Sequence, residues 1–263
     1  MTVISPTETL PSSEACYMAS TVFDSSTSDG VFLFPSEYMF VLMYYDAVLF
    51  DFDGVVVETP SSQRMYAALG RTYEKLGRSG PAAETFQELM QGDFEAIANR
   101  CRTLEIDTDV FCTQAARELI QTQLADVERG VRSVFDDVRV VRSIPVSLGV
   151  VSDNHPTVVT KLLDRFGLRS VFETVYGCPL TPDGLARRKP NPTNIETAME
   201  TLEADSALYV GDRGVDVQAA ANAGIDSVLL SRENRCSHPD DTSGVDPTYH
   251  CSSLTELPPL LES

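Results

Sequence analysis

Two aspartates one residue apart are the residues of this chain best placed for chemistry. Asp51 and Asp53 directly follow the apolar run Ala47–Phe50 and flank a single phenylalanine before Gly54. Four apolar residues closed by a turn signal predict a buried strand of a parallel sheet, and ligands of such sheets lie beyond the carboxyl ends of the strands. Both carboxylates lie on one side of an extended backbone and repel each other unless a cation neutralises them. Mg²⁺ prefers oxygen ligands and is the natural candidate; the alternative is a polar turn that merely ends a strand.

A second polar segment follows the predicted strand over residues 145–151 and precedes a predicted helix. It consists of Ser152, Asp153 and Asn154. A hydroxyl group and backbone N–H groups just before the start of a helix suit a phosphate oxygen. For Ser152 the alternative is that its hydroxyl caps the helix. We assign the next residue, His155, to the helix start, with a substrate contact as its alternative.

A third candidate is Lys189, which occurs in the basic, proline-bounded segment Arg187–Pro192 ahead of another predicted helix. The chain contains only three lysines, so a basic group held between prolines is an informative departure from the acidic composition. The alternative is a solvated charge on a loop.

Two more aspartates, Asp212 and Asp216, occur where a predicted strand over residues 207–210 ends and a predicted helix over residues 215–223 begins. Capping the start of a helix uses one carboxylate, so two at this point would be costly without a cation. The alternative is helix capping alone. The order along the chain is therefore an acid pair, a hydroxyl, a lysine and a second acid pair, each at the carboxyl end of a predicted strand.

Alternating strands and helices are expected to position these residues. The predicted strands are 47–50, 145–151, 171–176, 207–210 and 227–230, and the helices between them are 156–166, 192–202 and 215–223. This alternation predicts an α/β fold with a doubly wound parallel sheet. Between the first two strands, residues 61–76, 86–90, 94–98 and 109–127 have helical periodicity, which predicts an inserted all-helical domain.

The expected domain organisation follows from these patterns. Residues 44–59 and 135–263 are predicted to form a Rossmann-like core, and residues 60–134 a helical cap. Residues 1–43 are rich in serine, threonine and proline without periodicity, so they are expected to form a disordered extension.

The amino-acid composition limits which binding partners and which cellular compartment we expect for this protein. Thirty-nine acidic residues oppose twenty basic ones, for a net charge of −19. Such a chain repels nucleic acid and anionic membranes, so we expect neither as a partner. No apolar run is long enough to span a membrane, and the six scattered cysteines favour free thiols in the cytoplasm.

The acidic, lysine-poor composition also suggests a halophilic protein from a salt-rich cytoplasm. Removing salt is then expected to lower the melting temperature, because self-repulsion is no longer screened. Thermal unfolding in low and in molar KCl measures this. Equal melting temperatures in the two solutions contradict the hypothesis.

Two cysteines and two histidines near the C-terminus could form a zinc site: Cys236, His238, His250 and Cys251. Their spacings match no established zinc pattern, so we favour the interpretation that they are loop residues.

Taken together, the four polar segments resemble the motifs of the haloacid dehalogenase (HAD) superfamily, in its phosphoglycolate phosphatase and β-phosphoglucomutase-like subgroup. These motifs are an Asp-x-Asp strand end, a Ser or Thr, a Lys, and Gly-Asp-x-x-x-Asp, and all four match over residues 45–230. The helical insertion has the place and size of that superfamily's cap.

The resemblance implies a role for each candidate residue. Asp51 would be the nucleophile that forms an aspartyl phosphate, and Asp53 the general acid and base. Lys189 would contact both Asp51 and the phosphoryl group. The implied Mg²⁺ ligands are Asp51, the backbone carbonyl of Asp53, Asp212 and Asp216, and the implied phosphate ligands are Ser152, Lys189 and backbone N–H groups up to Gly54 and at Asp153 and Asn154.

The implied function is a Mg²⁺-dependent phosphatase for a small phosphorylated metabolite of the phosphoglycolate or sugar-phosphate type. Asp53 favours a phosphatase or a phosphomutase, because the dehalogenases of the superfamily lack an aspartate there. A β-phosphoglucomutase-like phosphomutase is the alternative, and a non-catalytic binding protein on the same fold is disfavoured because no motif residue is missing. We expect a monomer or a weak homodimer.

Overall fold

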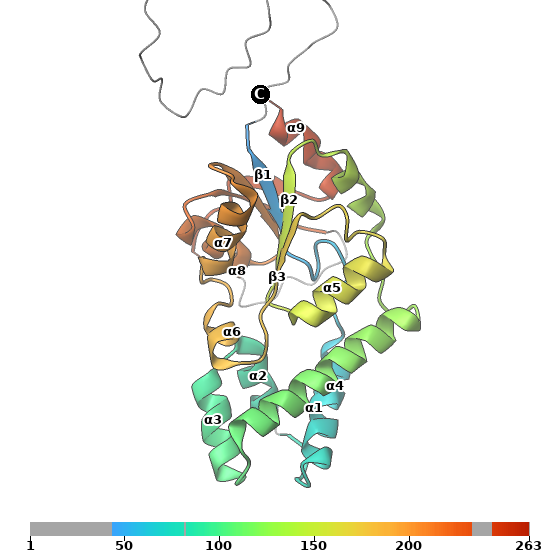
Figure 1. The fold of residues 1–263 in the computed structure, drawn as a ribbon, viewed down its shortest axis with the longest axis vertical. Coiled ribbons are helices and arrows are strands. Elements are labelled where there is room, and N and C mark those ends of the chain that lie inside the picture. The colour runs from blue at the N-terminus through green and yellow to red at the C-terminus, as the bar shows by residue number, and fades with distance from the viewer. Residues whose placement is uncertain (1–43, 82, 233–243, 263) are drawn as a thin grey trace, which may run out of the picture. The chain divides into compact units, whose positions relative to one another are not determined.

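The sheet at the centre of the molecule is built from parallel strands. The computed structural model describes residues 44–81, 83–232 and 244–262, so the predicted extension over residues 1–43 lies outside the described residues. In this part of the chain six strands form one sheet in the order β3-β2-β1-β4-β5-β6 (Figure 1). They are β1 (Ala47–Phe50), β2 (Ser147–Val151), β3 (Thr174–Tyr176), β4 (Ala207–Gly211), β5 (Asp226–Leu230) and β6 (Tyr249–Cys251).

Helices connect these strands, which confirms the predicted α/β fold class. The helices of this part are α5 (Pro156–Arg165), α6 (Pro182–Ala186), α7 (Thr193–Leu202), α8 (Gly214–Asn222) and α9 (Pro258–Leu261), with 3₁₀ helices at Asp136–Ser143 and Leu254–Glu256. The first five strands and α5, α7 and α8 agree with the predicted ranges to within a few residues. Strand β6 and helix α6 are additions, because three and five residues are too few to show a periodic pattern.

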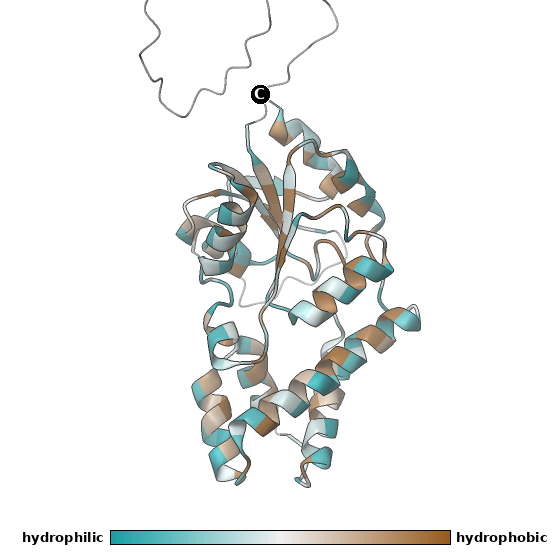
Figure 2. Ribbon diagram, viewed as in Figure 1, coloured by the Kyte–Doolittle hydropathy of each residue, from teal (hydrophilic) through white to brown (hydrophobic). Residues whose placement is uncertain are grey.

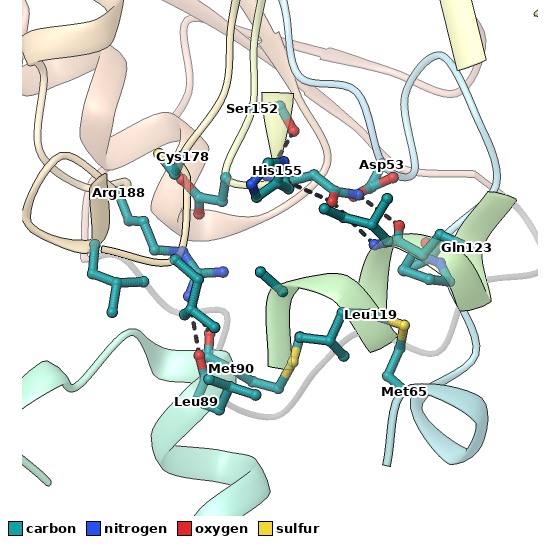
Figure 3. Close-up of a pocket in the computed structure, with 18 of the residues that line it drawn as sticks. Asp53, Met65, Leu89, Met90, Leu119, Gln123, Ser152, His155, Cys178 and Arg188 are labelled. Atoms are coloured by element: carbon teal, nitrogen blue, oxygen red, sulfur yellow. Dashed lines mark hydrogen bonds between the residues drawn. The ribbon is translucent and has the colours of Figure 1, made fainter. Parts of the chain in front are cut away.

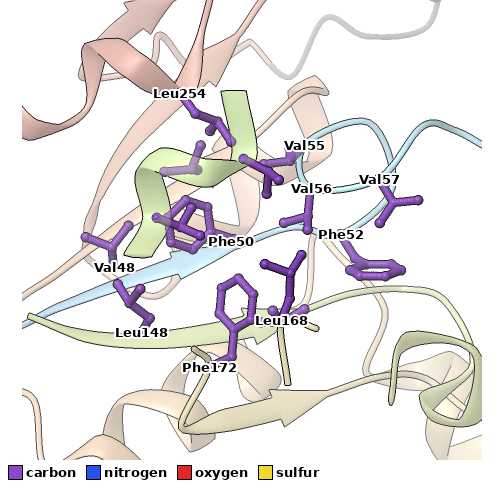
Figure 4. Close-up of a cluster of buried hydrophobic side chains, with 14 of the residues drawn as sticks. Val48, Phe50, Phe52, Val55, Val56, Val57, Leu148, Leu168, Phe172 and Leu254 are labelled. Carbon is purple, nitrogen blue, oxygen red and sulfur yellow. The ribbon is translucent and has the colours of Figure 1, made fainter. Parts of the chain in front are cut away.

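Both faces of the sheet are covered, which explains why β1 is apolar throughout. Its four side chains are all buried. Because side chains alternate along a strand, Val48 and Phe50 belong to the apolar cluster shared with α5, and Leu49 to the cluster shared with α7 and α8. Figure 4 shows Phe50 close to Phe172, and the two ring centroids are 5.9 Å apart. This double burial holds the carboxyl end of β1 firmly in place.

Four helices follow β1 before the chain returns to the sheet: α1 (Ser62–Lys75), α2 (Ala83–Gln91), α3 (Phe94–Thr103) and α4 (Thr108–Glu128). They share an apolar cluster that includes Leu69, Leu89, Ile97 and Phe111. Figure 2 shows strands that are largely brown or pale, whereas the helices carry both brown and teal residues, as expected for helices that bury one face. The predicted all-helical insertion is thereby confirmed. Among the described residues, no helix is long and apolar enough to cross a membrane.

The strand order creates a place for a ligand. Strands β1 and β4 are neighbours, with β2 and β3 on one side and β5 and β6 on the other. In parallel sheets, ligands bind beyond the strand ends at the point where the order reverses. Asp51 follows β1, Asp212 follows β4 and Ser152 follows β2. The residues predicted at strand ends therefore meet at one edge of the sheet.

Candidate active site

Three carboxylates form a cluster at this edge. Asp51 follows β1, Asp212 follows β4, and Asp216 lies in the first turn of α8. One oxygen from each lies within 4.8 Å of the others. The Asp216 carboxylate also accepts hydrogen bonds from the backbone N–H groups of Asp212 and Arg213, at 3.1 and 2.9 Å. Asp216 thus caps α8 as well as joining the cluster, so capping alone does not account for this acid pair.

Lys189 reaches into the same cluster from the segment between α6 and α7. It does not directly follow a strand as predicted, because α6 lies between it and β3. Its Nζ lies 2.8 Å from Asp51 Oδ1 and 2.5 Å from Asp216 Oδ1. It also donates to the Tyr209 hydroxyl at 3.0 Å, and that hydroxyl donates to the Val151 carbonyl at 2.8 Å. The Lys189 side chain is only 2% exposed. The alternative interpretation of Lys189 as a solvated loop charge is therefore wrong.

Burial controls the charges of this cluster. Burial raises the pKa of Asp51 to about 6, opposed by the attraction of Lys189 and assisted by the repulsion of Asp216. Burial by itself would lower the pKa of Lys189, but the carboxylates of Asp216 and Asp51 raise it well above its usual value. Lys189 is therefore charged at neutral pH. One lysine is shared between two acids, so a cation among the carboxylates would favour the ionised form of Asp51.

Arg213 is a further cation beside the cluster, and the sequence analysis missed it. Its Nη2 lies 3.4 Å from Asp153 Oδ2, and the other oxygen of Asp153 accepts the backbone N–H of Lys189 at 3.0 Å. Although burial opposes the charge, the carboxylates of Asp216, Asp51 and Asp153 raise the pKa of Arg213. The Asp153 side chain therefore positions Lys189, a role not visible in the local sequence.

Ser152 is buried next to this cluster, as its predicted position requires. Its hydroxyl oxygen accepts the backbone N–H of Asn154 at 3.1 Å, and its own N–H donates to the Tyr176 carbonyl at 3.0 Å. Helix α5 is instead capped by His155, whose Nδ1 accepts the N–H of Thr157 at 3.2 Å. The capping alternative for Ser152 is thus wrong, and the assignment of His155 to the helix start is confirmed.

The Asp53 carboxylate has partners of its own. Asp53 Oδ2 accepts from Asn154 Nδ2 at 2.7 Å, and Oδ1 is paired with Arg132. In the described residues the metal-ligand cluster contains the carboxylates of Asp51, Asp212 and Asp216 but not that of Asp53. Asp51 and Asp53 therefore have different surroundings, although they are separated by a single residue.

Arg132 and Gln123 extend this second network into the helical insertion. Arg132, 3% exposed, donates to the Glu58 carbonyl at 2.5 Å and to Gln123 Oε1 at 2.9 Å. The side-chain amides of Gln123 and Asn154 bond each other in both directions, at 2.7 and 3.1 Å. Nothing in the local sequence indicates this network, because Arg132 is 79 positions from Asp53.

The turn after Asp53 is internally bonded. Gly54 adopts φ of 87°, a backbone conformation that favours glycine, and its N–H donates to the Val57 carbonyl at 2.6 Å. Arg232 Nη2 donates to the Val55 carbonyl of the same turn at 2.9 Å. The predicted N–H donors at Gly54 and Asn154 are thus already bonded within the chain, and their role toward phosphate stays a prediction.

Gly211, at the end of β4, gives a test of how tightly the cluster is built. A Cβ at this position would lie 2.2 Å from Asp216 Cβ, and Asp216 is held by two backbone N–H groups. We expect Gly211→Ala to lower the free energy of unfolding by about 1–3 kcal/mol or more. Gly70→Ala within α1 meets nothing within 4 Å and is expected to raise it by about 0.5–1 kcal/mol. Denaturant unfolding measures both, and equal stability of the two variants would contradict the close packing at Gly211.

A cavity of about 190 Å³ opens beside the cluster. Asp51, Asp53, Ser152 and Asn154 line it from the sheet edge, and residues of α1, α2 and α4 line it from the helical insertion. Figure 3 shows Asp53 and Ser152 on one side, and Met65, Met90 and Leu119 on the other. The described part of the chain thus brings Asp51, Asp53 and Ser152 together at this cavity, with Lys189 behind Asp51.

The zinc hypothesis is not tested by the structure. Cys236 and His238 lie outside the described residues. His250 and Cys251 belong to β6, where Cys251 is buried.

The chain has a parallel α/β core with a helical insertion, and an acidic cluster lies at the ends of its strands. Comparison with known proteins identifies the family that has these features. The model of the haloacid dehalogenase-like hydrolases matches residues 48–230. The chain belongs to this family, which confirms that it is a hydrolase and an enzyme.

Similar proteins are consistent with this assignment. Phosphoglycolate phosphatase of Pseudomonas putida is 27% identical over 70% of this chain and 68% of its own length. Phosphoglycolate phosphatase of Synechococcus elongatus is 28% identical over 70% of this chain and 83% of its own length. Among solved structures, CbbY of Rhodobacter sphaeroides in complex with phosphate has a TM-score of 0.61 at 21% identity, covering 81% of this chain and 96% of that one. At that identity the likeness concerns the fold.

Proposed function

We propose that this protein is a Mg²⁺-dependent phosphatase that hydrolyses a small phosphorylated metabolite through a phosphoryl group held on Asp51. The observation that supports this most is Lys189, buried 2.8 Å from Asp51 and 2.5 Å from Asp216 at one edge of the sheet. Similarity to phosphoglycolate phosphatases supports a substrate of the phosphoglycolate or sugar-phosphate type.

Each step of the reaction has a residue for it. Asp51 attacks phosphorus, and its bond to phosphorus forms as the bond to the leaving oxygen breaks. Asp53 gives a proton to that oxygen and later takes one from the water that hydrolyses the aspartyl phosphate, which restores both aspartates. Lys189 and Ser152 hold the phosphoryl oxygens, and the charge of Lys189 makes the approach of two anions less costly.

The acidic cluster fits Mg²⁺. Three carboxylates within 4.8 Å provide the oxygen ligands that this ion prefers, and their combined charge exceeds that of Lys189. Asp51, Asp212 and the main-chain carbonyl of Asp53 would hold the ion, with Asp216 beside them. When bound, the ion supplies positive charge that stabilises the transferring phosphoryl group.

The network around Arg132 supports a role for the helical insertion. We assign residues 60–134 to a cap and residues 44–59 and 135–263 to the core. Arg132, near the end of this cap, is paired with Asp53 and donates to the carbonyl of Glu58, a core residue just before the cap begins. Asp53 is thereby positioned by a residue from the segment in which the chain leaves the cap. A cytoplasmic location and a monomeric or weakly dimeric state stay predictions.

Phosphate release from a panel of phosphorylated metabolites, with and without Mg²⁺, tests the proposed function. We expect hydrolysis of at least one small phosphate ester, its loss in EDTA, and its recovery when excess MgCl₂ is added. Full activity in EDTA contradicts the metal assignment. Isomerisation of a sugar phosphate without release of free phosphate would identify the phosphomutase alternative instead.

A further inference from the structure

Arg188 lines the cavity beside the active site, and no acid balances its charge. It is half-buried and lies one residue before Lys189. Its Nη1 donates to the main-chain carbonyls of Leu89 and Met90, at 3.3 and 3.0 Å. Among the described residues, no carboxylate forms an ion pair with its guanidinium group, although the chain has a net charge of −19. An unpaired cation in the wall of a cavity of so acidic a protein indicates an anionic ligand.

The helical insertion holds Arg188 in place without neutralising it. The two carbonyls that accept from Nη1 belong to the last turn of α2, where the helical hydrogen bonds end. Gly92 packs against the same side chain, because a Cβ at Gly92 would lie 3.0 Å from Arg188 Cδ. Figure 3 shows Arg188 beside Leu89 and Met90, on the other side of the pocket from Asp53. In the described part of the chain Nε and Nη2 of Arg188 make no hydrogen bond, so these two groups are left for a ligand.

His155 supplies another donor to the same cavity. Its Nδ1 accepts the N–H of Thr157 at 3.2 Å. Burial lowers the pKa of His155, so its ring is neutral at neutral pH. A neutral ring whose Nδ1 accepts has its proton on Nε2, which therefore donates. The side-chain nitrogen atoms that Arg188 and His155 present to a ligand are thus donors, and the group that suits them is an acceptor.

A carboxylate matches these donors better than the hydroxyl groups of a sugar do. It only accepts hydrogen bonds, and its two oxygens fit two N–H groups of one guanidinium. Each sugar hydroxyl also has a proton to donate, but the side-chain oxygens of Asp53 and Gln123 are already bonded within the chain. We infer that Arg188 determines specificity by binding a carboxylate on the leaving group, so that the substrate is a small phosphorylated hydroxy acid. This inference rests on the proposed function, because it requires the phosphoryl group to bind at Asp51.

The rest of the outer lining favours a short leaving group. A cavity of about 150 Å³ holds one benzene molecule, and this one measures about 190 Å³. A bound phosphoryl group therefore leaves room for only a few more atoms. Apolar side chains of the lining, among them Met65, Leu119 and Leu180, exclude water from this part of the cavity. The attraction between Arg188 and a carboxylate is stronger there than in water, because the dielectric constant is lower.

Two esters of equal size test the inference with the full chain and Mg²⁺. Phosphoglycolate and the phosphate ester of glycolamide differ only in that an amide replaces the carboxylate. The wild type should have kcat/KM at least about tenfold higher for phosphoglycolate, because the amide cannot form the ion pair. Arg188→Gln should lower kcat/KM for phosphoglycolate by about tenfold or more and leave that for the amide ester nearly unchanged. Equal wild-type values for the two esters, or a preference for ribose 5-phosphate, overturn the inference and leave the phosphatase intact.

Two further variants separate recognition of the carboxylate from the contact of Arg188 with α2. Arg188→Lys keeps the charge and should keep a larger preference for phosphoglycolate than Arg188→Gln does. Arg187→Gln removes the neighbouring cation, which is paired with the exposed Asp183, and should keep the whole preference. If Arg188 only held α2 in place, Arg188→Gln would lower kcat/KM for both esters by the same factor. That result contradicts the inference.

Binding provides a readout that does not depend on turnover. By calorimetry with Mg²⁺, 3-phosphonopropionate should bind the wild type at least about tenfold more tightly than propylphosphonate, which has a methyl group in place of the carboxylate. Arg188→Gln should bind the two about equally. If no ester is hydrolysed but this difference between the proteins holds, the proposed function fails and the role of Arg188 in binding stands. If the wild type binds both phosphonates equally, or if Arg188→Gln keeps the preference, the inference is overturned whatever the enzyme hydrolyses.

Discussion

Asp51→Asn is expected to reduce kcat by at least about a thousandfold while leaving the protein folded. An amide has the shape of the carboxylate but is a much weaker nucleophile, so the aspartyl phosphate cannot form at a useful rate. The fold should tolerate the change because burial already opposes the charge of Asp51, whose pKa it raises to about 6. Phosphate release from p-nitrophenyl phosphate measures the loss, and thermal unfolding measures the fold.

A second readout distinguishes the nucleophile from a metal ligand. After acid quenching during turnover, a fraction of the wild-type protein should carry the mass of one phosphoryl group, and Asp51→Asn should carry none. Asp164→Asn, an exposed change on α5, serves as the matched control with wild-type turnover. Turnover of Asp51→Asn close to that of this control would refute the mechanism.

Lys189→Met is expected to have the second largest effect, on stability as well as on turnover. It leaves the carboxylates of Asp51 and Asp216 buried without their shared cation. Breaking a buried ion pair on one side costs about 3–5 kcal/mol, and kcat should fall by about a hundredfold or more because one charge on the phosphoryl group is no longer balanced. Denaturant unfolding in EDTA and steady-state kinetics in Mg²⁺ measure the two effects.

The effect of Mg²⁺ on the melting temperature provides a second measurement for Lys189→Met. In Lys189→Met an added cation meets a more negative cluster, so MgCl₂ should raise its melting temperature by more than it raises that of the wild type. Lys161→Met removes an exposed lysine from α5 and should behave as the wild type in both respects. An equal response of all three proteins to MgCl₂ would argue against a metal site beside Lys189.

The strand-end residues were predictable because their signals are local. Asp51 and Asp212 each follow an apolar run that is buried on both faces of the sheet, as β1 and β4 are. Lys189 stands out because it lies in a basic segment with prolines, in a chain that is otherwise acidic and contains only three lysines. Once the strands are known to be parallel, their carboxyl ends must share one edge, so the meeting of Asp51 and Asp212 follows from topology. The position of Lys189 does not, because α6 lies between it and β3.

The partners of these residues were not predictable in the same way. Asp153 looks like a phosphate-binding loop residue, but its side chain holds the Lys189 backbone and contacts Arg213. Asp53 and Arg132 are brought together only when the chain leaves the helical insertion beside the point where it entered. Neither contact has a periodic or compositional signature, because each depends on how separate elements pack.

Asp51 and Asp53 show which features the local sequence determines and which depend on the tertiary structure. Their types, their spacing and the apolar run before them determined by sequence alone that two carboxylates stand at the end of a buried strand. Tertiary structure decided that they differ: Asp51 is buried against Lys189 and the second acid pair, whereas Asp53 is bonded to Asn154 and Arg132. The reason is physical. Whether a segment forms a buried strand depends on residues that are neighbours in the sequence. The electrostatic field at a carboxylate and its hydrogen bonds depend on groups that come within a few ångströms of it only when the chain folds.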